Sequence, residues 1–382
     1  MDIMEFQVGS RYLLKGLTTV KAAVSSAPVI PILESVLVRL TDDGQLLLTG
    51  SRSDNTITTK MEANVTHQGP ATGVAIPLGP LLDLLKKLPQ QPVTVKVDTK
   101  NFATTLKSAY GRYKLPGENG EDLPLPPASA GVTAFDLDSV AFADGIQKVT
   151  QHPSTDQLRP AMTGVLLELH TNRVRMVATD AHTCARYDMK ATVPTEVVQD
   201  TPQVIVPAAM LSAFRSSLES GEVLAVSVDK TSITLAVGNH SSHIVLIDAR
   251  YPAYEQIWPN NHLTATVDRH DLIACLGRVG VLSNRTTNQI ILDITDGAIV
   301  ATSDDADYDQ SASETMNVQL AGGDGLRIGF NHLLLTKALK GFDDPTVYVG
   351  FTSDHHAATV YQDTPNDASG ELCVLVMPVH LS

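Results

Sequence analysis

The chain has 382 residues, which is long for one hydrophobic core, so we expect two to three domains of roughly 100–200 residues each. Its 42 acidic and 28 basic residues give a net charge of −14, which argues against a generally basic nucleic-acid coat protein. Nucleic acid stays possible, because phosphates respond to the local arrangement of charge. With 43% hydrophobic and 18% charged residues, the composition is that of a globular chain and excludes a disordered one.

Cysteine spacing and the start of the chain indicate the compartment. Cys184, Cys275 and Cys373 lie far apart without CxxC spacing, so neither a disulfide framework nor a cysteine zinc site is expected. Asp2 and Glu5 stand where a secretory signal would carry positive charge. No apolar run approaches the ~20 residues of a membrane span. We therefore expect a cytoplasmic protein with no membrane association, cofactor or metal.

One amphipathic helix pattern occurs three times along the chain. Leu13, Leu17 and Val20 have the i, i+4, i+7 spacing of a buried helix face. The same spacing returns 129 and then a further 130 residues later, at Phe142, Ile146 and Val149 and at Leu272, Leu276 and Val279. Such self-similarity predicts three copies of one structural unit.

Each repeat continues with strands and a second helix. Alternating apolar residues around a short polar turn predict antiparallel strand pairs within 36–61, 165–189 and 290–316. Second helices are predicted at 78–88, 208–218 and 331–341, and proline-rich linkers at 115–134 and 251–264. The predicted fold is α+β, with three domains at 1–127, 128–255 and 256–382, each a doubled βαβββ-like motif.

The predicted helices carry basic residues away from their apolar faces. One off-core position holds Lys87, Lys148, Arg278 and Lys340 in four of the six helices, and Arg11 and Lys15 extend this face on the first helix. A solvated lysine-bearing surface is one interpretation. The other is a concave surface, lined by all six helices, that contacts a phosphate backbone without reading bases. Both stay open on the sequence alone.

The sequence offers little evidence for a catalytic site. Asp354, His355 and His356 are similar to a metal-dependent phosphoesterase motif, but neighbouring histidines in a predicted strand would point to opposite faces. No GxSxG, Walker A or dinucleotide fingerprint occurs. We therefore predict no catalytic residues and a binding or scaffold role in place of an enzyme.

Four segments resemble the bacterial DNA polymerase III β subunit family, the sliding clamps, in the family's order. They are 158–185 (LRPAMTGVLLELHTNRVRMVATDAHTCA), 27–33 (APVIPIL), 248–259 (DARYPAYEQIWP) and 376–381 (VMPVHL). The resemblance implies the DNA-clamp fold, in which a head-to-tail homodimer forms a ring with helices lining the hole and sheets outside. It also implies a processivity factor that encircles duplex DNA without sequence specificity. The implied partners are double-stranded DNA, a second copy, the DNA polymerase III α subunit, the clamp loader and other proteins with a clamp-binding motif.

The resemblance implies three sets of site residues. A peptide-binding pocket between the second and third domains would comprise Met162, Thr179, Ala181, His182, Thr183, Cys184, Pro259, Val376, Met377, Pro378, Val379 and Leu381. The residues facing DNA would be Arg11, Lys15, Lys87, Lys148, Arg159, Arg278 and Lys340. At the dimer interface, Arg112 and Tyr113 would face Val281, Leu282 and the acidic run 304–309, which includes Asp305 and Asp307.

The chain departs from the family pattern in the pocket. Ala181-His182-Thr183-Cys184 stands where most clamps read Gly-His-Arg-Leu, and Ala27 and His380 replace usual arginines. Losing guanidinium groups removes bidentate donors, so the peptide preference stays open. Two other functions remain alternatives: a diverged clamp paralogue acting as a protein-interaction hub, and a metal phosphoesterase using His355 and His356.

Overall fold

The computed structural model describes residues 3–381 except 25–27, 29, 53, 69–72, 127–133, 219–220, 324 and 364–369. Ala27, and residues 127–133 of the linker predicted at 115–134, therefore lie outside the described residues. The chain divides into two compact units. The first unit comprises 1–143, 194–201 and 209–246, and the second comprises 144–193, 202–208 and 247–382.

All six predicted helices are present. Within the described residues the α-helices are α1 (Ser10–Lys21), α2 (Leu78–Lys87), α3 (Ser139–Val149), α4 (Thr195–Asp200), α5 (Ala208–Leu218), α6 (Arg269–Gly280) and α7 (His332–Leu339). The apolar triplets that revealed the repeat are buried in α1, α3 and α6, which confirms their interpretation as core faces. Only α4 was not predicted, because its six residues are too few to show a helical period.

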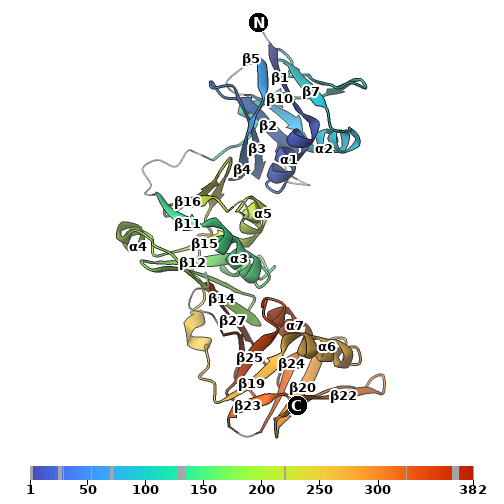
Figure 1. The fold of residues 1–382 in the computed structure, drawn as a ribbon, viewed down its shortest axis with the longest axis vertical. Coiled ribbons are helices and arrows are strands. Elements are labelled where there is room, and N and C mark those ends of the chain that lie inside the picture. The colour runs from blue at the N-terminus through green and yellow to red at the C-terminus, as the bar shows by residue number, and fades with distance from the viewer. Residues whose placement is uncertain are drawn as a thin grey trace. The chain divides into compact units, whose positions relative to one another are not determined.

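Two antiparallel sheets build the first unit. The five-stranded sheet has the order β5 (Asn64–Gln68), β1 (Ile3–Gly9), β7 (Pro92–Asp98), β8 (Thr104–Lys107) and β9 (Arg112–Leu115). The nine-stranded sheet has the order β10 (Glu118–Asn119), β6 (Val74–Pro77), β2 (Ser35–Leu40), β3 (Gln45–Arg52), β4 (Asn55–Glu62), β18 (His240–Val245), β17 (Ser232–Val237), β16 (Val223–Val228) and β11 (Ala134–Asp138). Helices α1 and α2 contact each other beside these sheets (Figure 1).

The second unit repeats this plan. Its nine-stranded sheet has the order β15 (Gln203–Pro207), β12 (Gly164–His170), β13 (Arg173–Thr179), β14 (Thr183–Lys190), β27 (Gly370–Val376), β26 (Ala358–Tyr361), β25 (Thr346–Phe351), β19 (Leu263–Asp268) and β23 (Gln319–Gly322). Its four-stranded sheet has the order β22 (Gln310–Asn317), β21 (Ala298–Asp305), β20 (Gln289–Thr295) and β24 (Leu326–Asn331). Helices α6 and α7 contact each other in the same way (Figure 1).

Each predicted strand pair proves to be three strands. The regions 36–61, 165–189 and 290–316 contain β2–β3–β4, β12–β13–β14 and β20–β21–β22. In the first and third regions the third strand was missed because threonine, serine and charged residues occupy many of its positions, as in NTITTKME of β4 and QSASETMN of β22. Apolar alternation, which marks a strand with one buried face, is therefore weak there. The predicted α+β class with antiparallel sheets is confirmed.

Candidate peptide-binding pocket and charged surfaces

Two segments of the predicted pocket meet as neighbouring strands of the second unit. In the pairing of β14 with β27, Thr183 lies opposite Val376 and Cys184 lies opposite Leu375. Just beyond the strand, the Met377 amide donates a hydrogen bond of 2.8 Å to the His182 carbonyl oxygen. Residues nearly two hundred positions apart in the chain are thus held side by side by backbone pairing.

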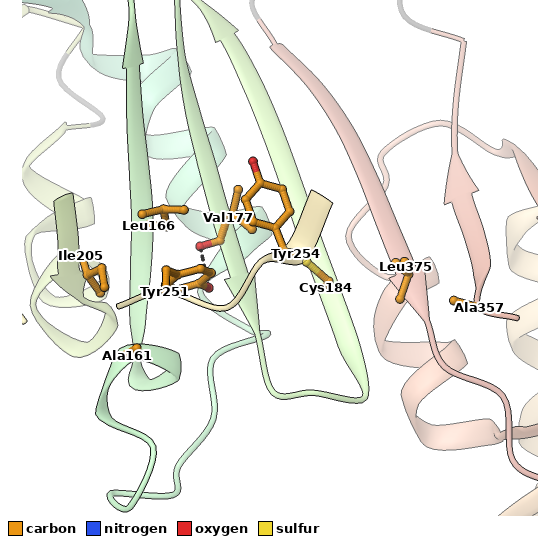
Figure 2. Packing of buried hydrophobic residues seen from close by; sticks show 9 residues of the cluster. All are labelled: Ala161, Leu166, Val177, Cys184, Ile205, Tyr251, Tyr254, Ala357 and Leu375. Carbon is orange, nitrogen blue, oxygen red and sulfur yellow. Dashed lines mark hydrogen bonds between the residues drawn. The ribbon is translucent and has the colours of Figure 1, made fainter. Parts of the chain in front are cut away.

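An apolar cluster lies beneath this strand pair. Its buried members are Ala161, Leu166, Val177, Cys184, Ile205, Tyr251, Tyr254, Ala357 and Leu375 (Figure 2). Trp258 and Met377 pack against it and are partly exposed. Burial raises the pKa of the Cys184 thiol to about 12, so this side chain acts as an apolar group.

The segment 251–259 is tied down by polar contacts as well as by burial. The Tyr251 hydroxyl donates to the Val177 carbonyl oxygen at 3.2 Å, which Figure 2 draws as a dashed line. The Tyr254 hydroxyl donates to a carboxylate oxygen of Glu168 at 2.8 Å. The Arg186 guanidinium stacks over the Trp258 ring, 4.7 Å from its centre. These contacts fix the half-buried Pro259, which follows Trp258 directly.

The predicted pocket residues separate by exposure. The buried ones are Met162, Thr179, Thr183, Cys184 and Val376. The half-buried or exposed ones are Ala181, His182, Pro259, Met377, Pro378, Val379 and Leu381. Only the second group therefore offers substantial surface to a ligand, and the buried group packs beneath it.

Leu381 lines a cleft to which none of the other predicted pocket residues contributes. Val379 and Gly329 form a bridge in which the Val379 amide donates to the Gly329 carbonyl oxygen at 2.8 Å, so the C-terminal segment runs along β24. A Cβ atom at Gly329 would lie 2.8 Å from the Val379 carbonyl oxygen, which the strand bridge holds in place, so this close approach requires glycine. Leu381 borders a polar cleft of about 570 Å³ together with Asn284, Thr287, Gln289, Ile291, Thr302, Ser303, Asp304 and Arg327.

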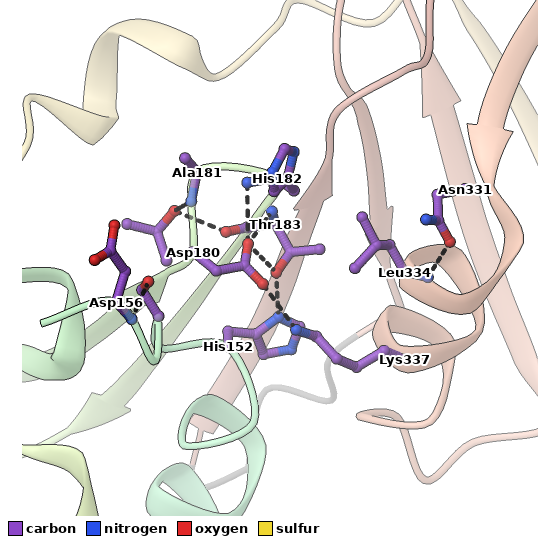
Figure 3. Close-up of polar contacts among 11 residues, drawn as sticks. His152, Asp156, Asp180, Ala181, His182, Thr183, Asn331, Leu334 and Lys337 are labelled. Carbon is purple, nitrogen blue, oxygen red and sulfur yellow. Dashed lines mark hydrogen bonds and ion pairs between the residues drawn. The ribbon is translucent and has the colours of Figure 1, made fainter. Parts of the chain in front are cut away.

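A polar network that the sequence did not reveal surrounds the turn between β13 and β14. Oδ1 of Asp180 accepts hydrogen bonds from the amides of His182 (3.0 Å) and Thr183 (2.6 Å) and from the Thr183 hydroxyl (3.0 Å). Its Oδ2 binds the Lys337 ammonium of α7 at 3.0 Å (Figure 3). Nδ1 of His152 lies 2.9 Å from the Thr183 hydroxyl oxygen. Asp180 sits in a TDAHT turn typical of aspartate capping, but no local pattern marks Lys337 or His152.

Asn331 and Leu334 lie at the start of α7 near this network (Figure 3). The Asn331 side chain caps the helix by accepting from the amides of Leu333 and Leu334. Leu333 is 54% exposed and Leu334 is half-buried, so the first turn of α7 presents apolar surface. No sequence pattern distinguishes these residues, since an asparagine followed by leucines is an ordinary helix start.

The seven residues predicted to face DNA differ in how their charges are balanced. Arg11, Lys15, Lys87 and Lys340 are exposed, and none has an ion pair within the described residues. Arg159 pairs with Asp156 at 3.0 Å, and Arg278 makes a two-pronged contact with the Glu314 carboxylate. The last two side chains are exposed, but their charge is largely compensated.

Lys148 is the largest departure from the expectation of a free cation. Its side chain is 13% exposed, and its ammonium lies 2.9 Å from Asp144 and 3.1 Å from Asp343. The Tyr187 ring centre is 5.7 Å away. Although burial opposes it, contact with these two carboxylates raises the pKa of Lys148 above its ordinary value. The ammonium therefore joins parts of the second unit and offers little charge to a ligand.

The residues predicted for the dimer interface differ in their exposure. Arg112 is exposed on β9, the edge strand of the five-stranded sheet, with Tyr113 half-buried beside it. Val281 is 77% exposed just after α6, and Leu282 is half-buried. The prediction for Asp305 needs correction, because this residue is buried and accepts hydrogen bonds from the Asn284 side chain and the Asp307 amide. Its carboxylate is occupied by the Asn284 side chain and by its own turn, whereas Asp307 is exposed.

The histidine pair at 355–356 lies in a turn, so its prediction as a strand was wrong. The two rings contact each other, with centres 4.7 Å apart, and do not point to opposite faces. Among the described residues there is no group of three or more histidine, cysteine or acidic side chains that could hold a metal ion. In the same part of the chain, no helix is both long and apolar enough to cross a membrane.

Three family models match successive parts of the chain. They are the N-terminal, central and C-terminal domains of the DNA polymerase III beta subunit, and they match residues 4–127, 136–253 and 255–379. Among curated relatives, the Beta sliding clamp homolog GriR of Streptomyces muensis is 29% identical over 98% of this chain and 99% of its own length. The Beta sliding clamp of a Synechocystis strain is 26% identical over 97% of both chains.

Solved structures share the fold at lower identity. The sliding clamp of Pseudomonas aeruginosa bound to griselimycin superposes with a TM-score of 0.90, at 24% identity and covering 99% of this chain and all of that one. The clamp of Bacillus subtilis has a TM-score of 0.89 at 22% identity, with the same coverage. These full-length matches do not favour the diverged hub or the phosphoesterase. The chain belongs to the DNA polymerase III beta subunit family, the beta sliding clamps, and is a non-catalytic processivity factor.

Proposed function

We propose that two copies of this chain join head to tail into a ring that encircles duplex DNA in the cytoplasm and tethers the replicative polymerase. The three domains would run over 1–127, 128–255 and 256–382, close to the limits of the three matched family domains. A closed ring stays on DNA by topology, so weak phosphate contacts suffice and sliding is permitted.

The observation that carries this proposal is a strand pairing left incomplete in the chain. Each repeat contains two sets of three consecutive antiparallel strands. The first set is β2–β3–β4, β12–β13–β14 or β20–β21–β22, and the second set is β7–β8–β9, β16–β17–β18 or β25–β26–β27. The last strand of a first set pairs with the last strand of a second set from another repeat. Thus β4 pairs with β18 and β14 pairs with β27, both antiparallel.

Of these six last strands, β22 and β9 are the two that lie at sheet edges within the described residues. Pairing β22 of one copy with β9 of another would join a four-stranded and a five-stranded sheet into nine strands, the size of the two sheets already present. Exposed edges of this kind are templates for pairing, and two such contacts close a dimer. Arg112 and Lys114 on β9 would then approach the acidic turn before β22.

The second part of the proposal concerns the pocket. Ala181, His182, Pro259, Met377 and Pro378 would receive a short peptide with a leucine or phenylalanine anchor, over the apolar cluster beneath. An apolar base with a few polar groups suits such an anchor. The clamp loader, the polymerase α subunit and other proteins that carry the motif would compete for this surface.

The test of ring function is topological. Labelled protein is loaded on a nicked circular duplex by its clamp loader, and half of the sample is then cut at one site. Gel filtration should show the protein retained on circles and lost from linear DNA. Equal retention on both forms would contradict encirclement, whereas loss from both would contradict stable loading.

A further inference from the structure

The turn that carries Ala181 and His182 has an unfavourable backbone. Ala181 adopts a φ of 75°, in the left-handed region that favours glycine. An alanine in this region has a backbone that must be held by its surroundings. The polar network around Asp180 supplies these surroundings.

Asp180 organises the turn from inside. Its carboxylate accepts from the two amides that follow Ala181, and the Thr179 hydroxyl accepts from the Ala181 amide at 3.2 Å. The Thr179 hydroxyl also donates to the Thr183 carbonyl oxygen at 2.7 Å. The amides of three successive residues are thus fixed by side chains, which defines the direction in which Ala181 and His182 point.

Lys337 holds Asp180 from another part of the second unit. It lies on α7, and its ammonium contacts the carboxylate at 3.0 Å with side-chain exposures of 26% for Lys337 and 18% for Asp180. Although burial opposes the charged form, the Thr183 amide and then Lys337 hold the pKa of Asp180 below its ordinary value. Because both side chains are partly buried, solvent and salt screen this pair less than they screen a fully exposed one.

His152 completes the network on its far side. Because the Thr183 hydroxyl donates to Asp180, its oxygen is left to accept from His152 Nδ1 at 2.9 Å. Burial and the nearby Lys337 ammonium lower the pKa of His152 to about 3, so the ring is neutral at physiological pH. Figure 3 shows Lys337 and His152 reaching the same Asp180–Thr183 pair.

We propose that Lys337 and Asp180 are positioning residues for peptide capture: their ion pair ties α7 to the turn 179–183 and presets the Ala181–His182 wall of the pocket. The inference rests on the proposed peptide-binding function. In the free chain this preorganisation lowers the conformational cost of docking, so its loss weakens binding without removing any contact to the peptide.

The test measures binding of a fluorescein-labelled peptide ending in Leu-Phe to the full-length protein by fluorescence anisotropy. Lys337→Met keeps the length of the side chain but removes its charge, and it should weaken the affinity about tenfold. Asp180→Asn should do the same, and the double variant should be no weaker than either single one. Lys337→Arg keeps the positive charge and should retain most of the affinity of the unaltered protein. The matched control is Lys86→Met, which removes an exposed Lys–Asp pair on α2 with a separation of 3.3 Å.

Two further measurements separate positioning from general stability. Amide hydrogen exchange at His182 and Thr183 should accelerate in Lys337→Met, while the melting temperature stays near that of Lys86→Met. Unchanged peptide affinity in Lys337→Met, or additive losses in the double variant, would overturn the inference. Absence of binding by the unaltered protein would instead overturn the pocket itself. If Lys337→Met does not fold, the peptide affinity and hydrogen exchange of Asp180→Asn and Lys337→Arg test the inference in its place.

Discussion

At the scale of single residues, the ion-pair partner of a charged side chain decides whether its charge is available to a ligand. Lys87 and Lys148 occupy equivalent positions on their helices, and the sequence treats them alike. The structure leaves Lys87 exposed and encloses Lys148 between Asp144 and Asp343. A compensated cation releases few counterions on meeting a phosphate, so the two should differ in DNA binding.

We expect Lys87→Met to reduce the dependence of DNA affinity on salt and Lys148→Met to leave it nearly unchanged. Each phosphate contact contributes about 0.9 to the slope of log affinity against log salt concentration on duplex DNA. The slope is measured by fluorescence anisotropy with a short linear duplex, and Lys86→Met is the control for an exposed lysine already paired with an aspartate. An equal loss of slope in the Lys87 and Lys148 variants would show that Lys148 leaves its carboxylates to reach DNA.

His152 should make the stability of the protein dependent on pH. Its pKa falls from an ordinary value near 6.5 to about 3 on folding, chiefly because the ring is buried. The unfolded chain therefore binds the proton more readily, so stability is complete above pH 6.5 and declines as the pH falls toward 3. The decline is at most about 1.4 kcal/mol per pH unit.

The check is urea unfolding of the protein and of His152→Asn between pH 7 and 5. Asparagine can still donate to Thr183 but does not titrate. The difference in unfolding free energy between the two proteins should therefore shrink as the pH falls. A constant difference would mean that His152 becomes protonated within the folded chain at an ordinary pKa.

At the scale of elements, the third strand of a repeat is the one that pairs with a neighbouring repeat. Strand β4 is polar enough to escape prediction from apolar alternation, and β14 alternates but was not separated from the strand before it. Both strands make the pairings that extend the two nine-stranded sheets. Their backbone groups, which are indifferent to side-chain polarity, supply the ladder bonds. The sequence could therefore predict where the repeats lie but not how they are joined.

Charge reversal at the open edge should weaken the dimer. In a dimer paired through β9 and β22, Arg112→Glu would bring an acidic side chain toward the acidic run 304–309, where Asp304 and Asp307 are exposed. We expect the dimer dissociation constant to rise at least about tenfold, since like charges across an interface cost more than 1 kcal/mol. Sedimentation velocity at sub-micromolar concentration measures this, with Lys86→Glu as the control reversal. A full-sized Arg112→Glu dimer under these conditions would contradict the assignment of β9 to the interface.

At the scale of the whole molecule, net charge is a poor guide to function. The chain carries a net charge of −14, and three of its seven candidate DNA-facing cations are already paired within it. A ring does not need tight binding, because topology replaces affinity as the means of retention. The few unpaired cations on α1, α2 and next to α7 are therefore compatible with the role of this family.

The sequence by itself determined the threefold repeat, the six helices with their buried faces, and the family, because each depends on local periodicity or on contiguous motifs. The tertiary structure alone decided which strands join the repeats, which cations remain available and what holds the turn 179–183. Lys337 and Asp180 are 157 residues apart, and Lys148 meets Asp343 from a different repeat. Local patterns report the faces of one element, whereas such contacts exist only after elements pack, and their energies depend on the burial that packing creates.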